Sequence, residues 1–167
     1  MFDRVIVPLD GSPTSEAILP AARAAAAPGG QLHLLRVVPP PLAAIGVGFG
    51  DPAAVFVPPP EDDAAEWARA EAYLQRIAAH LAPGPAVHTL VRRGRTADEI
   101  VLAARELGAE LIAMSTHGRT GLGLLVMGSV AGEVVRSAQT PVLLVRPDAT
   151  TLKAADSAPA STGPQSG

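Results

Sequence analysis

Short β-branched segments alternate with helical segments along this chain, and that alternation restricts the fold more than any other feature of the sequence. The strand-like segments cover residues 4–9, 31–38, 86–93, 110–115 and 141–146, and the helical patterns cover residues 13–27, 63–81, 96–107 and 130–138. Each pair of parallel strands needs a crossover connection, which is usually a helix. The sequence therefore predicts an α/β fold, a doubly wound five-stranded parallel sheet with helices on both faces.

Capping signals mark where several of these helices begin and end. Ser12 is placed to cap a helix whose first residue is Pro13, a position where an N–H donor is not needed. Thr96 and Glu99 have the spacing of a capping box, in which two side chains satisfy the first backbone N–H groups. Gly108 follows the same helix and can end it with a left-handed backbone conformation.

Length and composition exclude several classes of protein. One domain with a core suits a chain of 167 residues of which 48% are hydrophobic, and we assign that domain to residues 1–147. Residues 148–167 have few apolar anchors and are expected to form a disordered tail. The chain has no cysteine, which excludes disulfides, thiolate metal sites and a cysteine nucleophile.

Charge and hydropathy bear on partners and location. Thirteen basic residues and a net charge of −3 give no basic excess, so neither nucleic acid nor an anionic membrane surface is expected as a partner. The amino terminus shows no export signal, and no apolar run reaches the length that spans a membrane. We therefore expect a cytoplasmic protein that binds a small ligand or another protein.

The segment STHGRTGLGLLVMGS, residues 115–129, joins the expected fourth strand to the next helix and has an unusual composition. Its glycines permit a close approach of the backbone that a Cβ atom would obstruct, and Ser115, Thr116 and Ser129 add hydroxyl groups. The helix that follows turns its positive amino terminus toward the same space. In a doubly wound sheet, ligands bind at this edge. The segment therefore predicts a phosphate-binding site.

Three widespread signatures are absent from the sequence. It contains no G-x-x-x-x-G-K-[ST] segment, no G-x-G-x-x-G after the first strand and no G-x-S-x-G. The phosphate site is therefore of another class than the P-loop or the dinucleotide fingerprint.

Three segments resemble the universal stress protein family: VIVPLDGS at 5–12, RRGRTADEIVLAARELGAELIAMSTHGRTGLGLLVMGSVAGEVV at 92–135 and PVLLVR at 141–146. The nucleotide motif of that family is Gly-x2-Gly-x9-Gly-[Ser/Thr], and Ser115, Gly118, Gly128 and Ser129 hold its positions here. A serine thus replaces the first glycine, but it is small and can still donate a hydrogen bond, so we expect the site to persist. The resemblance implies a Rossmann-like fold of the adenine nucleotide alpha hydrolase type.

The resemblance also implies an ATP site and places its residues on this sequence. Asp10 is expected beside the ribose or base, and the backbone of Val37 beside the adenine. The full set implied is Pro8, Asp10, Val37, Met114, Ser115, Thr116, His117, Gly118, Arg119, Gly128, Ser129 and Val130. The sequence has no evident cluster of metal ligands, so a Mg²⁺ or Mn²⁺ ion would arrive with the phosphates.

The last strand carries a further implication of the resemblance. In the family this strand commonly pairs with its copy across a two-fold axis, and an apolar edge strand invites such pairing. We therefore expect a homodimer through Val142, Leu143, Leu144 and Val145.

Several of these residues also have a purely structural interpretation. Asp10 could close a turn, Ser129 could cap the following helix, and His117 could hydrogen-bond its own loop. The basic group at residues 92–95 could steer an anion or form a solvated strand end. Trp67 falls on the apolar stripe of its helix and is expected to pack.

The residues favour nucleotide binding over turnover. Hydrolysis of ATP needs groups that orient water and stabilise charge on the transferring phosphoryl group, and the glycine-rich segment offers no lysine and a single arginine, Arg119. We expect a dimeric regulatory or stress-response factor that binds ATP, with no catalytic residue and at most slow ATP hydrolysis. Two alternatives stay open: a nucleotide-independent adaptor that uses the apolar stretch 39–60 as its partner surface, and a true ATP hydrolase.

Overall fold

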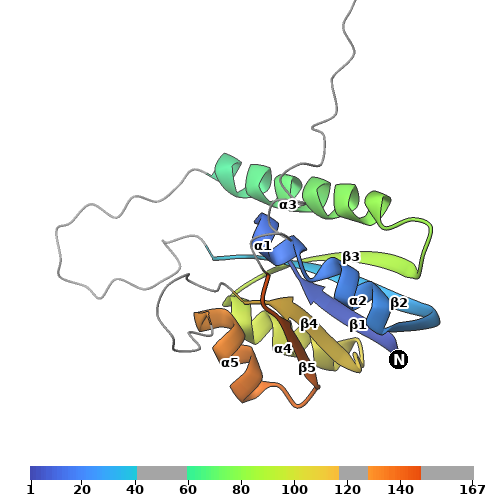
Figure 1. The fold of residues 1–167 in the computed structure, drawn as a ribbon. Coiled ribbons are helices and arrows are strands. Elements are labelled where there is room, and N and C mark those ends of the chain that lie inside the picture. The colour runs from blue at the N-terminus through green and yellow to red at the C-terminus, as the bar shows by residue number, and fades with distance from the viewer. Residues whose placement is uncertain (41–59, 117–127, 148–167) are drawn as a thin grey trace, which may run out of the picture.

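A computed structural model describes residues 1–40, 60–116 and 128–147, and its sheet confirms the predicted architecture (Figure 1). The five strands are parallel and lie in the order β3-β2-β1-β4-β5. Their bounds are Phe2–Pro8 for β1, Ala26–Val38 for β2, Ala86–Arg93 for β3, Leu111–Ser115 for β4 and Val142–Val145 for β5. The chain places β2 and β3 on one side of β1 and then β4 and β5 on the other. The strand order therefore reverses between β1 and β4.

Helices cover both faces of this sheet, as Figure 1 shows. One face carries α1 (Pro13–Glu16), α2 (Leu19–Ala25) and α3 (Pro60–His80), and the other carries α4 (Thr96–Glu106) and α5 (Ser129–Ser137). Alternate side chains of each strand enter the two cores. In β1, Val5 and Val7 join the core under the first three helices, and Ile6 joins the core under the other two; all three are fully buried.

The first helical segment is broken where one continuous helix was predicted. α1 ends at Glu16 and α2 begins at Leu19, with a turn between them. Pro20 explains the break, because proline has no N–H to donate and its ring clashes with the carbonyl four residues earlier, which here is that of Glu16. Alanine content alone suggested a longer helix than the backbone can form.

β2 begins at Ala26, earlier than the sequence predicted. Phe2 pairs with Ala26, but the next paired residue, Arg4, lies opposite Gln31, so β2 bulges between these two pairs. Glycines permit the bulge: Gly29 has a φ of +78°, and a Cβ at Gly30 would lie 3.1 Å from the carbonyl oxygen of Phe2. The turn predicted at residues 28–30 is an irregularity within a strand.

The capping signals correctly predicted the start of α1 and the end of α4, but the start of α4 was predicted wrongly. The hydroxyl of Ser12 accepts a hydrogen bond from the N–H of Ser15 at 3.1 Å, and Pro13 is the first residue of α1. At α4, Arg95 is the N-cap residue and Thr96 is already helical, so the predicted capping box does not form. The carboxylate of Glu99 lies 3.5 Å from the guanidinium of Arg92 instead. The same helix ends before Gly108, which has a φ of +58°.

The packing of α3 follows the predicted stripe. Ala70, Leu74, Ile77 and Leu81 are buried against the sheet. Trp67 is half-buried; its indole N–H donates to Glu71 at 2.9 Å, and the guanidinium of Arg93 lies 5.7 Å from its ring centre.

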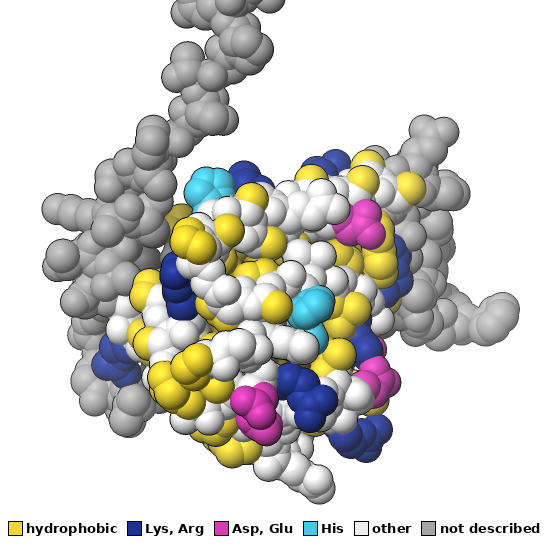
Figure 2. Space-filling model, turned by 90° about the vertical axis from the view of Figure 1, so that its right-hand side faces the viewer, with side chains coloured by type: hydrophobic (Ala, Val, Ile, Leu, Met, Phe, Trp, Pro, Cys, Tyr) yellow, Lys and Arg dark blue, Asp and Glu magenta, His cyan; other side chains and the backbone are white. Residues whose placement is uncertain are grey.

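No helix in the described parts of the chain is long and apolar enough to cross a membrane. On the side of the molecule shown in Figure 2, basic and acidic side chains lie interspersed among apolar ones. Residues 41–59 of the apolar stretch and the expected tail at 148–167 lie outside the described residues.

Replacing Leu34 by alanine should lower the free energy of unfolding by about 2–5 kcal/mol, because this fully buried side chain of β2 would leave a cavity in the core. Denaturant unfolding followed by circular dichroism measures the loss. Val135, which is 40% exposed on α5, is the control, and its replacement by alanine should change stability by less than about 0.5 kcal/mol. Equal losses in the two variants would contradict the packing described.

Candidate functional site

A cavity of about 560 Å³ lies at the carboxyl ends of β1, β2 and β4, where the strand order reverses. Its walls come from the β1–α1 turn, the ends of β2 and β4, and the first turns of α4 and α5. This is the position at which open α/β sheets bind ligands, and the volume lies in the range of small-molecule sites.

Nine of the twelve residues predicted for the site line this cavity. They are Pro8, Asp10, Val37, Met114, Ser115, Thr116, Gly128, Ser129 and Val130. The other three, His117, Gly118 and Arg119, lie outside the described residues. Segments more than 100 residues apart in sequence are thus brought to one space by the parallel sheet.

The turn between β1 and α1 is held by a compact set of hydrogen bonds. Oδ1 of Asp10 accepts from the N–H of Ser12 at 2.9 Å, and the N–H of Asp10 donates to the hydroxyl of Ser15 at 3.2 Å. The hydroxyl of Ser15 also donates to the carbonyl of Ser12 at 2.9 Å. Asp10 therefore closes the turn, as its structural interpretation predicted, and also lines the cavity.

α1 is tied to α3 behind this turn. The Tyr73 hydroxyl on α3 donates to Oε1 of Glu16 at 3.0 Å. Burial raises the pKa of the Tyr73 hydroxyl, and the carboxylate of Glu16 raises this pKa further, so the hydroxyl keeps its proton and donates. This contact fixes the helix from which Ser15 faces the cavity.

The end of β2 presents backbone groups to the cavity. The N–H of Leu9 donates to the carbonyl of Leu35 at 2.8 Å, and the N–H of Gly94 donates to the carbonyl of Val38 at 3.1 Å on the other side of β2. Backbone groups along a strand alternate between its two neighbours, so those of Val37 point to the same side as those of Leu35. On that side β1 has already ended, which leaves the edge of Val37 facing the cavity.

α5 begins at the opposite wall, and no side chain among the described residues caps its first N–H groups. Gly128 is the N-cap residue, and its carbonyl accepts from the N–H of Gly132 at 2.8 Å. Ser129 is the first helical residue, so the prediction that it could be the cap was wrong by one position. The N–H groups of residues 129–131 precede the first intrahelical bond, and all three residues line the cavity. The first turn of α5 also has no acidic side chain, which suits it to an anion.

Nothing within the described protein explains why residue 128 is glycine. Its φ of −51° is open to any residue, and a Cβ built on Gly128 would meet no atom within 4 Å. Among the described residues, the space over this backbone is therefore open, as a close approach by a ligand requires.

Ser115, which departs from the family motif, has a structural partner. Its hydroxyl donates to the backbone carbonyl of Thr14, which joins the end of β4 to α1 across the cavity wall. The serine that replaces the motif's first glycine thus holds two elements together.

Sequence reasoning missed seven residues that line the cavity: Leu9, Ser15, Leu35, Arg36, Thr96, Ile100 and Ala131. Several of these residues could have been predicted from their positions. Arg36 precedes Val37, and Thr96 and Ile100 share one face of α4. Whether Arg36 can bind a ligand depends on where its side chain points, which the sequence does not specify.

The basic group at residues 92–95 behaves as a structural network. Arg92 pairs with Glu99 and Glu106, and Arg95 pairs with Asp98 on its own helix and Glu133 on α5. The hydrogen bond to Glu106 is the main influence that raises the pKa of Arg92. No residue of this group is among those that line the described cavity. The structural alternative is thus supported over anion steering.

Metal ligands are not gathered in the part of the chain that the structure describes. No three His, Asp or Glu side chains there lie close enough together to hold an ion.

A family model described as the universal stress protein family matches residues 1–146 of the chain. A universal stress protein from Thermus aquaticus is 33% identical over 147 residues, which cover 87% of this chain and all of that protein. Another match is more local: the universal stress protein MJ0531 of Methanocaldococcus jannaschii is 44% identical over 63 residues, which span 37% of its length and 38% of this chain.

Solved structures share the fold. The hypothetical protein MJ0577 of Methanocaldococcus jannaschii superposes with a TM-score of 0.65 at 24% identity, over 89% of this chain and 98% of that one. A universal stress protein from Arabidopsis thaliana, solved with AMP bound, has a TM-score of 0.58 at 15% identity, over 88% of this chain and 93% of that one. At these identities the likeness establishes the α/β fold of the chain.

Replacing Ser115 by alanine should lower the free energy of unfolding by about 1 kcal/mol, because the carbonyl of Thr14 loses its hydrogen-bond donor. Ser137→Ala is the control, since that hydroxyl donates to the carbonyl of Glu133 within exposed α5 and joins no separate elements. Its replacement should change stability by less than about 0.5 kcal/mol in the same denaturant titration. A Ser115→Ala protein as stable as the Ser137→Ala protein would show that the β4–α1 contact does not stabilise the fold.

Proposed function

The chain belongs to the universal stress protein family, and we propose that it binds an adenine nucleotide, ATP above all, in the cavity at the carboxyl ends of β1, β2 and β4. One observation carries the proposal. The cavity joins the edge of Val37 that no described strand pairs to a helix amino terminus, at residues 128–131, that no described side chain caps. An adenine nucleotide needs both features: its base needs a hydrogen-bonding edge, and its phosphates need N–H donors and a positive potential.

The base would lie at the β2 end of the cavity. Adenine offers a donor and an acceptor on one edge, and the N–H and C=O of Val37 form the matching pair. Leu35, Ile100 and Met114 provide apolar surface beside that edge, as the flat faces of a purine require.

The ribose would lie between the base and the phosphates, beside Asp10. A carboxylate accepts hydrogen bonds from ribose hydroxyls, which is the role that an acidic residue has in other nucleotide folds. Asp10 lies in the β1–α1 turn, and β1 separates β2 from β4 in the sheet, so its position suits this middle place.

The phosphates would lie against the first turn of α5. The N–H groups of residues 129–131 and the positive end of the helix dipole favour an anion there. Mg²⁺ or Mn²⁺ would be held through the phosphate oxygens and would offset their charge. The Arabidopsis thaliana relative with AMP bound, which shares this fold, supports an adenine nucleotide as the class of ligand.

The described lining suits retention of the nucleotide more than its hydrolysis. Asp10 is the one carboxylate among the described lining residues, and it belongs to the ribose position in this arrangement. We assign no catalytic residue, and we expect at most slow ATP hydrolysis. The protein then acts as a regulatory or stress-response factor whose state follows the nucleotide bound.

The homodimer is part of the same proposal. β5 is an edge of the described sheet, in which it pairs with β4, so its outer backbone groups face away from the other strands. Two copies of β5 could pair through residues 142–145, which covers both edges. Leu143 and Leu144 contact different cores, so each face of the paired strands would continue a core of the monomer.

Replacing Gly128 by serine should weaken ATP binding about tenfold or more while leaving the fold intact. The added Cβ and hydroxyl would fill space that is open over the backbone, and serine caps a helix at least as well as glycine. Titration calorimetry with ATP and Mg²⁺ measures affinity, and thermal unfolding without nucleotide verifies stability.

The matched control is Gly29→Ala, outside the cavity. It should lower stability because Gly29 has a φ of +78°, but it should leave ATP affinity unchanged. If the unmodified protein binds no adenine nucleotide and releases none when freshly purified and denatured, the adaptor alternative replaces the proposal.

Replacing Leu144 by lysine should shift the protein from dimer to monomer in sedimentation velocity, because a charged side chain would enter the paired strands. Circular dichroism verifies that the variant is folded, since Leu144 also packs against the α4 and α5 core. Val135→Lys, on exposed α5, should remain dimeric. A folded Leu144→Lys protein with unchanged mass would count against pairing through β5.

A further inference from the structure

We propose that Arg36 forms a second anion-binding position in the cavity, at the ribose, so that this protein prefers adenosine nucleotides with a phosphate on the 2′ or 3′ ribose oxygen as well as at the 5′ oxygen. The inference rests on the proposed function, because it takes the cavity as an adenine nucleotide site. It adds a class of ligand and names Arg36 as the residue that selects it. Arg36 is not among the site residues predicted from the sequence.

The position of the guanidinium is the first support. Nη1 of Arg36 lies 3.4 Å from the carbonyl oxygen of Leu9 and 3.8 Å from the point where a Cβ of Gly11 would stand. Leu9 and Gly11 flank Asp10 on either side. The positive group of Arg36 therefore lies over the β1–α1 turn, next to the residue proposed for the ribose.

The capacity of this guanidinium for further bonds is the second support. A guanidinium has five N–H donors, and the contact with Leu9 is one bond at the long end of the accepted range. Arg36 is half-buried and lines the cavity. It forms none of the ion pairs found between described residues, whereas Arg92 and Arg95 each pair with two carboxylates. Donors of Arg36 thus remain to meet a ligand.

The charge distribution around the cavity is the third support. Arg36 is the one Lys or Arg among the described lining residues, and it is distant in the sheet from the α5 terminus. It lies on β2, on one side of β1, while the phosphates at the 5′ end would lie beyond the other side, where β4 leads to α5. A single 5′ phosphate chain at α5 would therefore leave Arg36 without an anionic partner from the ligand.

The chemistry of the ribose connects these observations. Asp10 suits free ribose hydroxyls, and an arginine beside the ribose suits a phosphate on one of them, because bidentate N–H groups match phosphate oxygens. Here the guanidinium of Arg36 lies at the carbonyl of Leu9, the residue that precedes Asp10. A phosphate on the 2′ or 3′ oxygen would gain charge-assisted hydrogen bonds from Arg36, which would outweigh its repulsion by Asp10.

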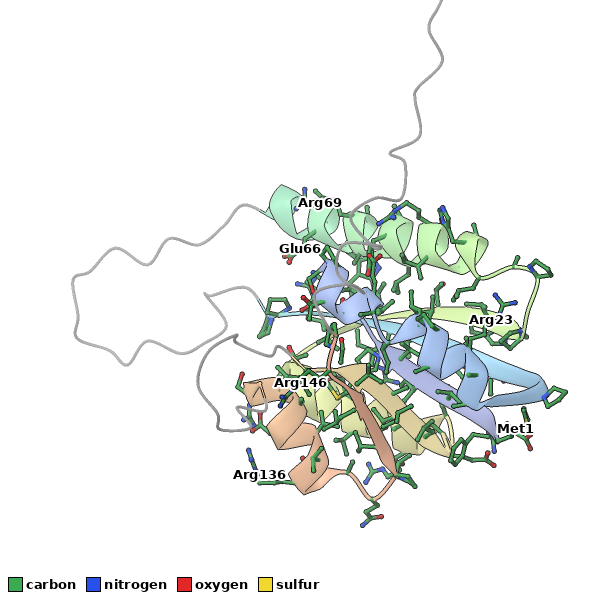
Figure 3. The ribbon with its side chains drawn as sticks, viewed as in Figure 1. Met1, Arg23, Glu66, Arg69, Arg136 and Arg146 are labelled. Atoms are coloured by element: carbon green, nitrogen blue, oxygen red, sulfur yellow. The ribbon has the colours of Figure 1, made fainter. Side chains whose placement is uncertain are left out.

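Four ligands and three proteins test the proposal by titration calorimetry. The ligands are adenosine, 5′-AMP, adenosine 3′,5′-bisphosphate and adenosine 2′,5′-bisphosphate. The proteins are the unmodified chain, Arg36→Gln, and Arg136→Gln as a control that removes the same charge. Arg136 lies in the last turn of α5 (Figure 3), is exposed, and is not among the residues that line the described cavity.

The unmodified protein should bind one of the two bisphosphates about tenfold or more tightly than 5′-AMP. Arg36→Gln should reduce that preference to about twofold or less and keep its affinity for 5′-AMP within about threefold, which also shows that the variant is folded. Arg136→Gln should retain the full preference. The isomer preferred identifies which ribose oxygen carries the phosphate.

Two results would overturn the inference. The first is an unmodified protein that binds 5′-AMP but neither bisphosphate more tightly; the proposed function would then stand without it. The second is a preference that Arg36→Gln leaves intact, which would assign to Arg36 the structural role of holding the Leu9 carbonyl. Failure of all four ligands to bind would instead remove the proposed function itself.

Discussion

The site depends on one constraint: β1 ends before the strands on either side of it in the sheet. β1 turns into α1 after Pro8, while β2 continues to Val38 and β4 lies on the other side. On its β1 side the backbone of Val37 therefore has no described strand to pair with, although the backbone of Leu35 still binds Leu9. An unpaired polar edge is costly unless solvent or a ligand satisfies it. The topology thus creates, at one point, both the space for a ligand and the hydrogen-bonding groups that would hold it.

The helices divide that space into chemically different ends. α4 and α5 both begin at the cavity, yet only α4 carries carboxylates, Asp98 and Glu99, in its first turn. Those carboxylates already meet the positive end of the α4 dipole, whereas the α5 terminus has no acidic side chain to do so. The network from Arg95 to Glu133 ties the two helices together. The proposed position of the phosphates at α5 therefore rests on the absence of acidic side chains from its first turn and their presence in that of α4.

The sequence predicted the features that depend on hydrophobic period or on a motif. It did not predict those that depend on the direction of a side chain. The alternation of strands and helices, the stripe on α3 and the Ser12 cap all reflect local rules. Nine predicted site residues converge because the carboxyl ends of parallel strands must share one edge. The capping box at Thr96 failed because Glu99 is paired with Arg92 from β3, a contact that no local rule contains. Arg36 was overlooked because its neighbour Val37 contributes through its backbone, while the guanidinium reaches across to the β1–α1 turn.

The sequence by itself determined the fold class, the parallel sheet and the segments that surround the cavity, because these depend on hydrophobic period, turn residues and a motif of fixed spacing. Tertiary structure alone decided the rest. It extended β2 back to Ala26 through pairing with Phe2, whereas the break at Pro20 follows from a local rule, the missing N–H and the ring clash of proline. It also set Arg36 against the carbonyl of Leu9 and Ser115 against that of Thr14, contacts that join residues from separate elements. Such contacts depend on the packing of the whole sheet, and no window of neighbouring residues encodes that packing.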